Sequence, residues 1–200
     1  LRIITAPTTE PVTLNEAKLH MFGSTTFASD DALITTLIAA VRKAAENKTR
    51  RALVQQTLEL TLPDWPANSL IELPRPPLQS VTTIKYIDTS GTLTTVPASE
   101  YQVDTYAEPG LVKPAYNESW NSTRKDFSAV QVRYVAGYAV GSPQDAIGLV
   151  ENVPEPIKVW IKMRVATIYE HPESISAGNL NEMPRDFVDG LLDPFIVSVF

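Results

Sequence analysis

Apolar residues recur at helical spacing near both ends of the chain. In the stretch 30–51, apolar side chains fall three and four residues apart, as on one face of a helix: Leu33, Ile34, Leu37, Ile38, Val41 and Ala45. Acidic residues open this stretch and basic residues close it, which complements the dipole of a helix. The pattern therefore predicts a long amphipathic helix over residues 30–51.

Shorter helices are predicted on either side of this stretch. Thr13 and Glu16 have the spacing of a capping box, in which each side chain accepts a hydrogen bond from the other residue's backbone N–H, so a helix is predicted from there to about residue 22. Prolines at 154 and 156 suit a first helical turn, where no intrahelical N–H bond is lost, and predict a helix over 153–169. A last short helix is predicted between Pro184 and Pro194.

Between these helices the apolar period changes to two, which is typical of half-buried strands. Turn signals such as Ser90-Gly91 and Pro109-Gly110 separate the strand candidates. Six strands are predicted: residues 57–62, 70–73, 81–88, 93–96, 101–104 and 130–135. Residues 114–127 show no clear period and are predicted to form a long surface loop.

These patterns predict an α+β fold. Helices from the N- and C-terminal parts form the scaffold, and a small, mainly antiparallel β-module is inserted between them. The expected parts are residues 1–53 (N-terminal helical part), 54–140 (β-module) and 141–200 (C-terminal helical part and tail, one folding unit with 1–53). We expect the helices at 30–51 and 153–171 to pack together, because each carries an apolar stripe.

Composition narrows the functional classes. The 200 residues include no cysteine and only two histidines, which excludes disulfide scaffolds and thiol nucleophiles and disfavours a His-based metal cluster. The net charge of −6 argues against general adhesion to nucleic acid. No apolar run approaches the ~18 residues of a membrane span, and the N-terminal segment has no apolar core of a signal peptide. We therefore expect no membrane partner, and synthesis in the cytoplasm.

Chemistry-bearing motifs are missing from the sequence. There is no Gly-x-Ser-x-Gly elbow, Walker loop, Gly-x-Gly-x-x-Gly or His-Glu-x-x-His. Asp30 and Asp31 could bind a divalent cation, but we interpret one of them or Ser29 as the N-cap of the following helix. Glu170 and His171 are interpreted as a solvated helix end. We therefore predict no enzymatic activity, no cofactor and no metal site.

Five cations cluster between residues 42 and 51, with Glu46 as the one acid among them. They are Arg42, Lys43, Lys48, Arg50 and Arg51. One interpretation is a solvated helix end; the other is contact with DNA phosphate or with an acidic partner. Taken without context, the cluster favours the first.

The last six residues are almost entirely apolar and carry no charge. The apolar ones are Phe195, Ile196, Val197, Val199 and Phe200. A free segment of this kind would be an aggregation hazard, so we expect it to be buried. It either folds back onto its own subunit or crosses to a neighbour or partner, and Pro194 favours an extended departure from the preceding helix.

Aromatic residues gather in the β-module and the loop before its last strand. They are Tyr116, Trp120, Phe127, Tyr134 and Tyr138. Since no RNA-binding motif accompanies them, we interpret them as core or interface residues of the sheet rather than base-stacking groups.

Five segments in order along the chain resemble the head–tail connector (adaptor) proteins of tailed bacteriophages and prophages. They are VTLNEAKLHM at 12–21, the acid-started, Ala-rich stretch at 30–53, LPRPPLQSVTTIKYID at 73–88, VQVRYVAGY at 130–138 and VPEPIKVWI at 153–161. The most telling is 73–88, a Pro-rich bend that runs straight into a strand.

This resemblance implies a structural protein of the virion neck, at the portal vertex, made in the cytoplasm of a bacterial host. Such proteins form a ring, commonly of twelve subunits, that docks beneath the portal protein. Genomic DNA passes through the lumen as non-specific cargo during packaging and ejection, and the stopper or tail-completion protein docks below.

The resemblance also bears on the candidate residues. It favours contacts of Arg42, Lys43, Arg50 and Arg51 with the portal or a neighbouring subunit rather than with DNA, because the chain is net negative. It likewise implies that the C-terminal residues 195–200 reach the portal. The alternative is a minor tail or decoration protein whose β-module binds protein or carbohydrate.

Overall fold

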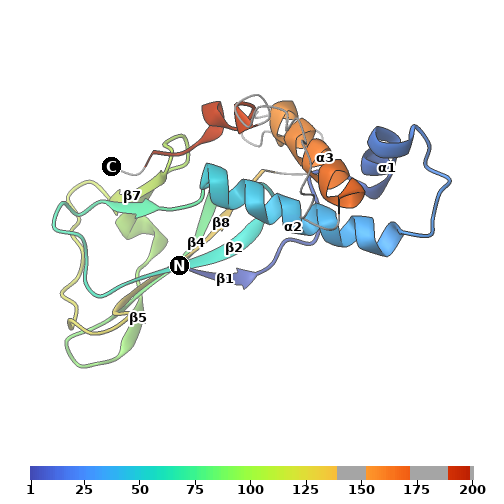
Figure 1. Ribbon diagram of the computed structural model, residues 1–200. Coiled ribbons are helices and arrows are strands. Elements are labelled where there is room, and N and C mark those ends of the chain that lie inside the picture. The colour runs from blue at the N-terminus through green and yellow to red at the C-terminus, as the bar shows by residue number, and fades with distance from the viewer. Residues whose placement is uncertain (139–151, 172–188, 199–200) are drawn as a thin grey trace, which may run out of the picture. The chain divides into compact units, whose positions relative to one another are not determined.

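The computed structural model describes residues 1–138, 152–171 and 189–198 of the chain (Figure 1). The fold is mixed α+β with mainly antiparallel sheets, as predicted. The chain divides into two compact units, which we call unit 1 and unit 2. Unit 1 contains residues 1–7 and 54–138, and unit 2 contains residues 8–53 and the described residues after 138.

Unit 2 contains the helices. They are α1 (Leu14–Phe22), α2 (Asp31–Thr49), α3 (Glu155–Glu170) and the short 3-10 helix η2 (Asp193–Phe195). The capping box at the start of α1 is confirmed. The Thr13 N–H donates to Glu16 Oε2 at 2.7 Å, and the Glu16 N–H donates to Thr13 Oγ1 at 3.2 Å. The final helix predicted at 184–194 lies largely outside the described residues.

The predicted packing of the long helix on the C-terminal helix is confirmed, because α2 and α3 are in contact (Figure 1). The buried positions of α2 follow one face: Ile34, Ile38, Val41 and Ala45. Leu37 is half-buried and Leu33 is 51% exposed. The face in contact is thus narrower than the predicted stripe, because each step of one residue turns a side chain by about 100° around the helix axis.

The prediction of an N-cap among Ser29, Asp30 and Asp31 is confirmed in position, because Asp30 is the N-cap of α2. The expected side-chain capping bond does not form. Instead Asp30 Oδ2 accepts the Tyr169 hydroxyl of α3 at 2.5 Å, and Asp31 Oδ1 accepts the buried Lys18 ammonium of α1 at 2.8 Å. Both acids therefore join α2 to another helix of unit 2, a role that helix-start statistics cannot reveal.

Unit 1 contains two antiparallel sheets. The larger has the order β1 (Arg2–Thr5), β2 (Gln56–Leu62), β8 (Val130–Ala136), β4 (Leu78–Ile87) and β5 (Leu93–Thr95). The smaller has the order β3 (Ile71–Leu73), β7 (Gly110–Pro114) and β6 (Tyr101–Asp104), with the 3-10 helix η1 (Ala98–Glu100) just before β6.

Two of these strands, β1 and β7, were not predicted. All four residues of β1 are exposed, so its sequence carries no alternation of buried and open positions. The strand β7 alternates but is only five residues long, follows Pro109 and ends at Pro114. In both cases pairing with other strands, β1 with β2 and β7 with β3 and β6, makes the strand rather than its local pattern.

The core of unit 1 lies between its two sheets. Tyr134 of β8 is fully buried, and its hydroxyl donates to the Pro74 carbonyl at 2.7 Å, beside the Pro-rich bend. Gly110 of β7 packs so closely on Leu78 of β4 that an added Cβ would lie 2.5 Å from the Leu78 Cδ2. Only glycine permits this approach of the smaller sheet to the larger one.

Candidate interaction surfaces

The predicted basic cluster resolves into separate contacts within unit 2. Arg42 donates from Nε to Glu10 at 2.7 Å and from Nη1 to Glu46 at 3.0 Å, and its side chain is only 12% exposed. Glu46 is buried and also accepts the Leu53 backbone N–H at 3.1 Å. The Lys43 ammonium lies 3.8 Å from Glu46. Arg42 thus compensates a buried carboxylate that holds the end of α2.

Lys48 pairs with Asp189, at 2.7 Å. Asp189 also accepts the Trp160 indole N–H at 3.1 Å and an Arg164 N–H at 3.2 Å. The hydrogen bond from Lys48, with smaller contributions from Trp160 and Arg164, lowers the pKa of Asp189 to about 2. No local motif in the sequence marks Asp189. The one signal for it is a lone acid in the otherwise uncharged run FVDGLL.

The two sets of candidate residues meet where α2 ends. Arg51 is buried and donates from Nε to the Phe195 carbonyl at 2.7 Å. The Val197 N–H donates to the Thr49 carbonyl at 3.0 Å, and Val197 is itself 9% exposed. Through Val197, therefore, the C-terminal segment is held by its own unit.

Other candidate residues near this end of α2 are exposed to solvent. Arg50 adopts a left-handed conformation with φ of 58° and is exposed. Lys43 and Ile196 are also exposed. Val199 and Phe200 lie outside the described residues.

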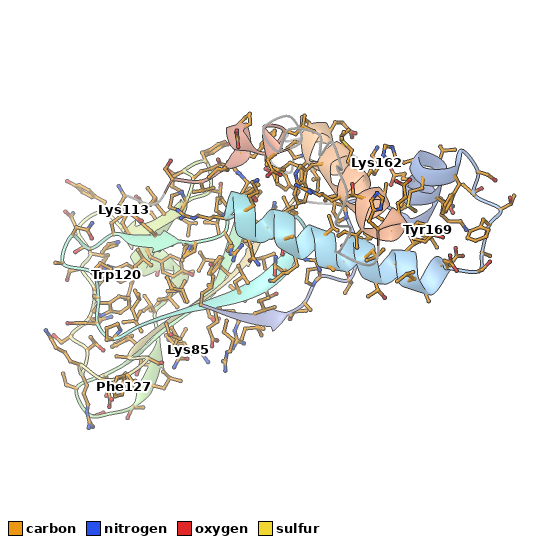
Figure 2. The ribbon with its side chains drawn as sticks, viewed as in Figure 1. Lys85, Lys113, Trp120, Phe127, Lys162 and Tyr169 are labelled. Atoms are coloured by element: carbon orange, nitrogen blue, oxygen red, sulfur yellow. The ribbon has the colours of Figure 1, made fainter. Side chains whose placement is uncertain are left out.

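The aromatic residues of unit 1 fall into two groups. Tyr134 and Tyr138 are core residues. In contrast, three aromatics on loops are largely exposed: Tyr106 (81%), Tyr116 (86%) and Phe127 (95%). Figure 2 labels Phe127 and Trp120 in this part of unit 1.

A tryptophan stack fixes the loop before β8. Trp65 and Trp120 lie parallel, with ring centroids 4.4 Å apart and an interplanar angle of 2°. The Trp120 indole N–H donates to the Ser69 carbonyl at 2.9 Å, and the Trp65 indole N–H donates to the Asn121 carbonyl at 2.8 Å. The predicted loop is thus an anchored surface segment that presents Tyr116 and Phe127 to solvent.

The outward face of the larger sheet carries a carboxylate between two guanidinium groups. Glu59 is 5% exposed and lies 2.6 Å from Arg2 and 2.7 Å from Arg133. The hydrogen bonds from Arg133 and then Arg2 lower the pKa of Glu59. Sequence reasoning missed this group because it treats charges on the polar side of a strand as solvated.

Metal ligands and membrane-spanning helices are two further features to look for in the described residues. Among them, no three His, Cys, Asp or Glu side chains gather as they would around a metal ion. Within the same residues, no helix is long and apolar enough for a membrane crossing.

Comparison with known proteins shows what this fold is similar to. No family model matches the sequence, and no curated protein matches it. Solved structures of gene transfer agent (GTA) particles contain chains with a similar fold. One is the virion of the native particle (TM-score 0.76, 19% identity), and another is the neck of the empty particle computed with C6 symmetry (0.76, 20%). A third is the neck of the native particle computed with C12 symmetry (0.72, 19%). Each match covers 100% of this chain and 96% of the other chain.

Proposed function

We propose that this chain is a structural protein of a virion neck, a head–tail connector or adaptor. In this role it forms a ring beneath the portal protein, genomic DNA passes through the lumen as non-specific cargo, and a stopper or tail-completion protein docks below. The observation that supports this proposal is the similarity of fold, over the whole chain, to chains in solved structures of GTA particles and their necks.

The same matches support a ring as the working form. The similar chains belong to necks computed with C6 and with C12 symmetry, so we propose twelve copies around one axis. A ring requires that each copy presents two different surfaces to its neighbours, because a heterologous contact that closes on itself generates a cyclic assembly.

We further propose that the exposed residues near the end of α2 contact the portal or a neighbouring subunit. These are Lys43, Arg50 and Ile196. We extend the proposal to Val199 and Phe200, on the sequence resemblance alone. Arg42, Arg51, Phe195 and Val197 support this surface from within, because their polar or apolar groups are engaged in unit 2.

The test is co-expression with the portal protein of the same particle, followed by native mass spectrometry. The expected result is a portal complex carrying twelve copies of this chain, with the chain alone remaining monomeric or forming the same ring. A chain that assembles without the portal as a trimer would instead support a minor tail or decoration protein. The exposed Tyr106, Tyr116 and Phe127 favour that second function, since aromatic side chains are frequent at binding surfaces.

A further inference from the structure

Unit 1 carries excess positive charge on the outward face of its larger sheet. Residues that are direct partners across antiparallel strands share a face, so the pairs Arg2–Glu59 and Glu59–Arg133 place these three side chains on one side. Lys85 lies on the same side, because it pairs with Gln131, which is two residues from Arg133 on β8. We call Arg2, Glu59, Lys85 and Arg133 the basic face. It holds three cations and one carboxylate, whereas the chain as a whole is net negative.

The charge of the basic face is not neutralised within the described residues. Glu59 is shared by Arg2 and Arg133, so two cations have one carboxylate between them. No ion pair to Lys85 forms among the described residues, and Lys85 is half-buried on β4 (Figure 2). The register places four threonines and Gln131 on the same face, together with three apolar residues, Ile87, Leu93 and Val135. The face is therefore a polar, cationic surface suited to an acidic partner.

The outward face of the smaller sheet has the opposite sign. Its register pairs Glu72 with Leu111, Leu111 with Asp104, and Lys113 with Gln102, so these five residues share one side. Ile71, Leu73 and Val112 occupy the other side, which is buried against the core. We call Glu72, Gln102, Asp104, Leu111 and Lys113 the acidic face. Both of its carboxylates are on exposed residues, and neither has an ion pair among the described residues.

We propose that the basic face of one copy docks on the acidic face of the next copy. The contact joins two different surfaces of the same unit, so it is heterologous and repeats from copy to copy, as a ring requires. The half-buried Leu111 adds apolar area at the centre of the acidic face, between Glu72 and Asp104. The proposal rests on the ring form proposed above and names the surfaces that build it.

A second copy fits the basic face better than duplex DNA does. Three cations, two of them engaged by Glu59, would release few counterions from a duplex. A protein neighbour, in contrast, needs a surface of complementary charge. The acidic face supplies such a surface on every copy.

The experiment reverses the net charge of each face in a separate variant. The first variant, Lys85→Glu with Thr61→Glu, leaves Arg2 and Arg133 on Glu59 but gives the basic face more carboxylates than cations. The second, Glu72→Lys with Gln102→Lys, gives the acidic face three cations against Asp104, which keeps its turn bonds to the Tyr106 and Ala107 N–H groups. A matched control, Lys125→Glu with Ser122→Glu, makes the same charge change as the first variant on exposed loop positions.

Each protein is co-expressed with the portal, its folding is checked by circular dichroism, and its copy number is measured by native mass spectrometry. The wild type and the control are expected to form rings, and each face variant alone is expected to lose at least tenfold in ring yield. Mixed in equal amounts, the two variants are expected to restore rings in which they alternate, because each then meets opposite charge on both sides.

Other outcomes overturn the proposal. Rings from either face variant alone at the wild-type yield show that the faces do not meet, and leave the proposed neck function standing. Failure of the mixture to restore rings has the same meaning when both variants are folded. If the first variant forms rings but loses salt-sensitive binding to duplex DNA, the basic face contacts DNA instead. A wild type that forms no ring with its portal contradicts the neck function and this contact together.

Discussion

At the scale of single residues, carboxylates hold segments of unit 2 together. Asp189 accepts hydrogen bonds from two helices: from Lys48 of α2, and from Trp160 and Arg164 of α3. Its pKa is lowered from 3.8 to about 2, chiefly by the Lys48 hydrogen bond. A group with a lowered pKa in the folded state stabilises the protein above its unfolded pKa, and this stabilisation is lost as the pH falls through the folded value.

We therefore expect Asp189→Asn to lower the free energy of unfolding by about 1–2 kcal/mol at pH 7. The full pKa shift would correspond to slightly more, but the side chain is 26% exposed and partly screened. The difference from the wild type should shrink between about pH 4 and pH 2 in urea melts. Asp193→Asn, at an exposed position, serves as the control. An unchanged gap down to pH 2 would show that Asp189 acts through packing alone.

At the scale of elements, the contact between α2 and α3 depends on a narrow stripe. Ile38 is 2% exposed on this stripe, whereas Leu33 on the same helix is 51% exposed. We expect Ile38→Ala to lower the free energy of unfolding by ~2–5 kcal/mol, because it leaves a cavity. Leu33→Ala should change it by less than ~0.5 kcal/mol. Equal effects of the two substitutions in denaturant melts would contradict this assignment of the buried face.

The start of α1 offers a second test at this scale. Thr13→Ala removes both side-chain bonds of the Thr13 hydroxyl, to Glu16 Oε2 and from the Glu16 N–H. We expect a loss of about 1 kcal/mol, the usual contribution of an N-cap. Thr13→Ser, which keeps the hydroxyl, should restore most of the stability measured by the same melts. If serine does no better than alanine, the capping bond contributes little.

At the scale of the whole molecule, the C-terminal segment is held by its own unit, and we propose that it also contacts the portal. Deletion of residues 195–200 removes the Arg51 and Thr49 contacts and the buried Val197, so we expect a loss of about 2–3 kcal/mol. In a chain of this size, that corresponds to a lower melting temperature by roughly 4–12 °C.

Deletion of residues 199–200 alone separates the two roles. This shorter deletion retains every contact described for the segment, so the melting temperature should stay within about 1 °C of the wild type. If the last residues reach the portal, the yield of portal-bound rings falls while the melt is unchanged. Full ring yield from this variant would remove Val199 and Phe200 from the contact surface.

The sequence by itself predicts elements whose signal is local. The capping box at Thr13, the existence of α2 with four of its six predicted buried positions, and the alternation in β2 and β8 all follow from neighbours within a few residues. Each such element buries one side, and the period of apolar residues records which side it is. The α+β class follows from the same patterns.

Tertiary structure alone decided the candidate site. Arg51 meets the Phe195 carbonyl 144 residues away, and Arg133 meets Glu59 74 residues away. A basic residue has the same local sequence signal whether it faces solvent or compensates a remote carboxylate. The sequence therefore shows that basic residues gather at 42–51, but their division into internal pairs and exposed residues depends on chain segments that only folding brings together.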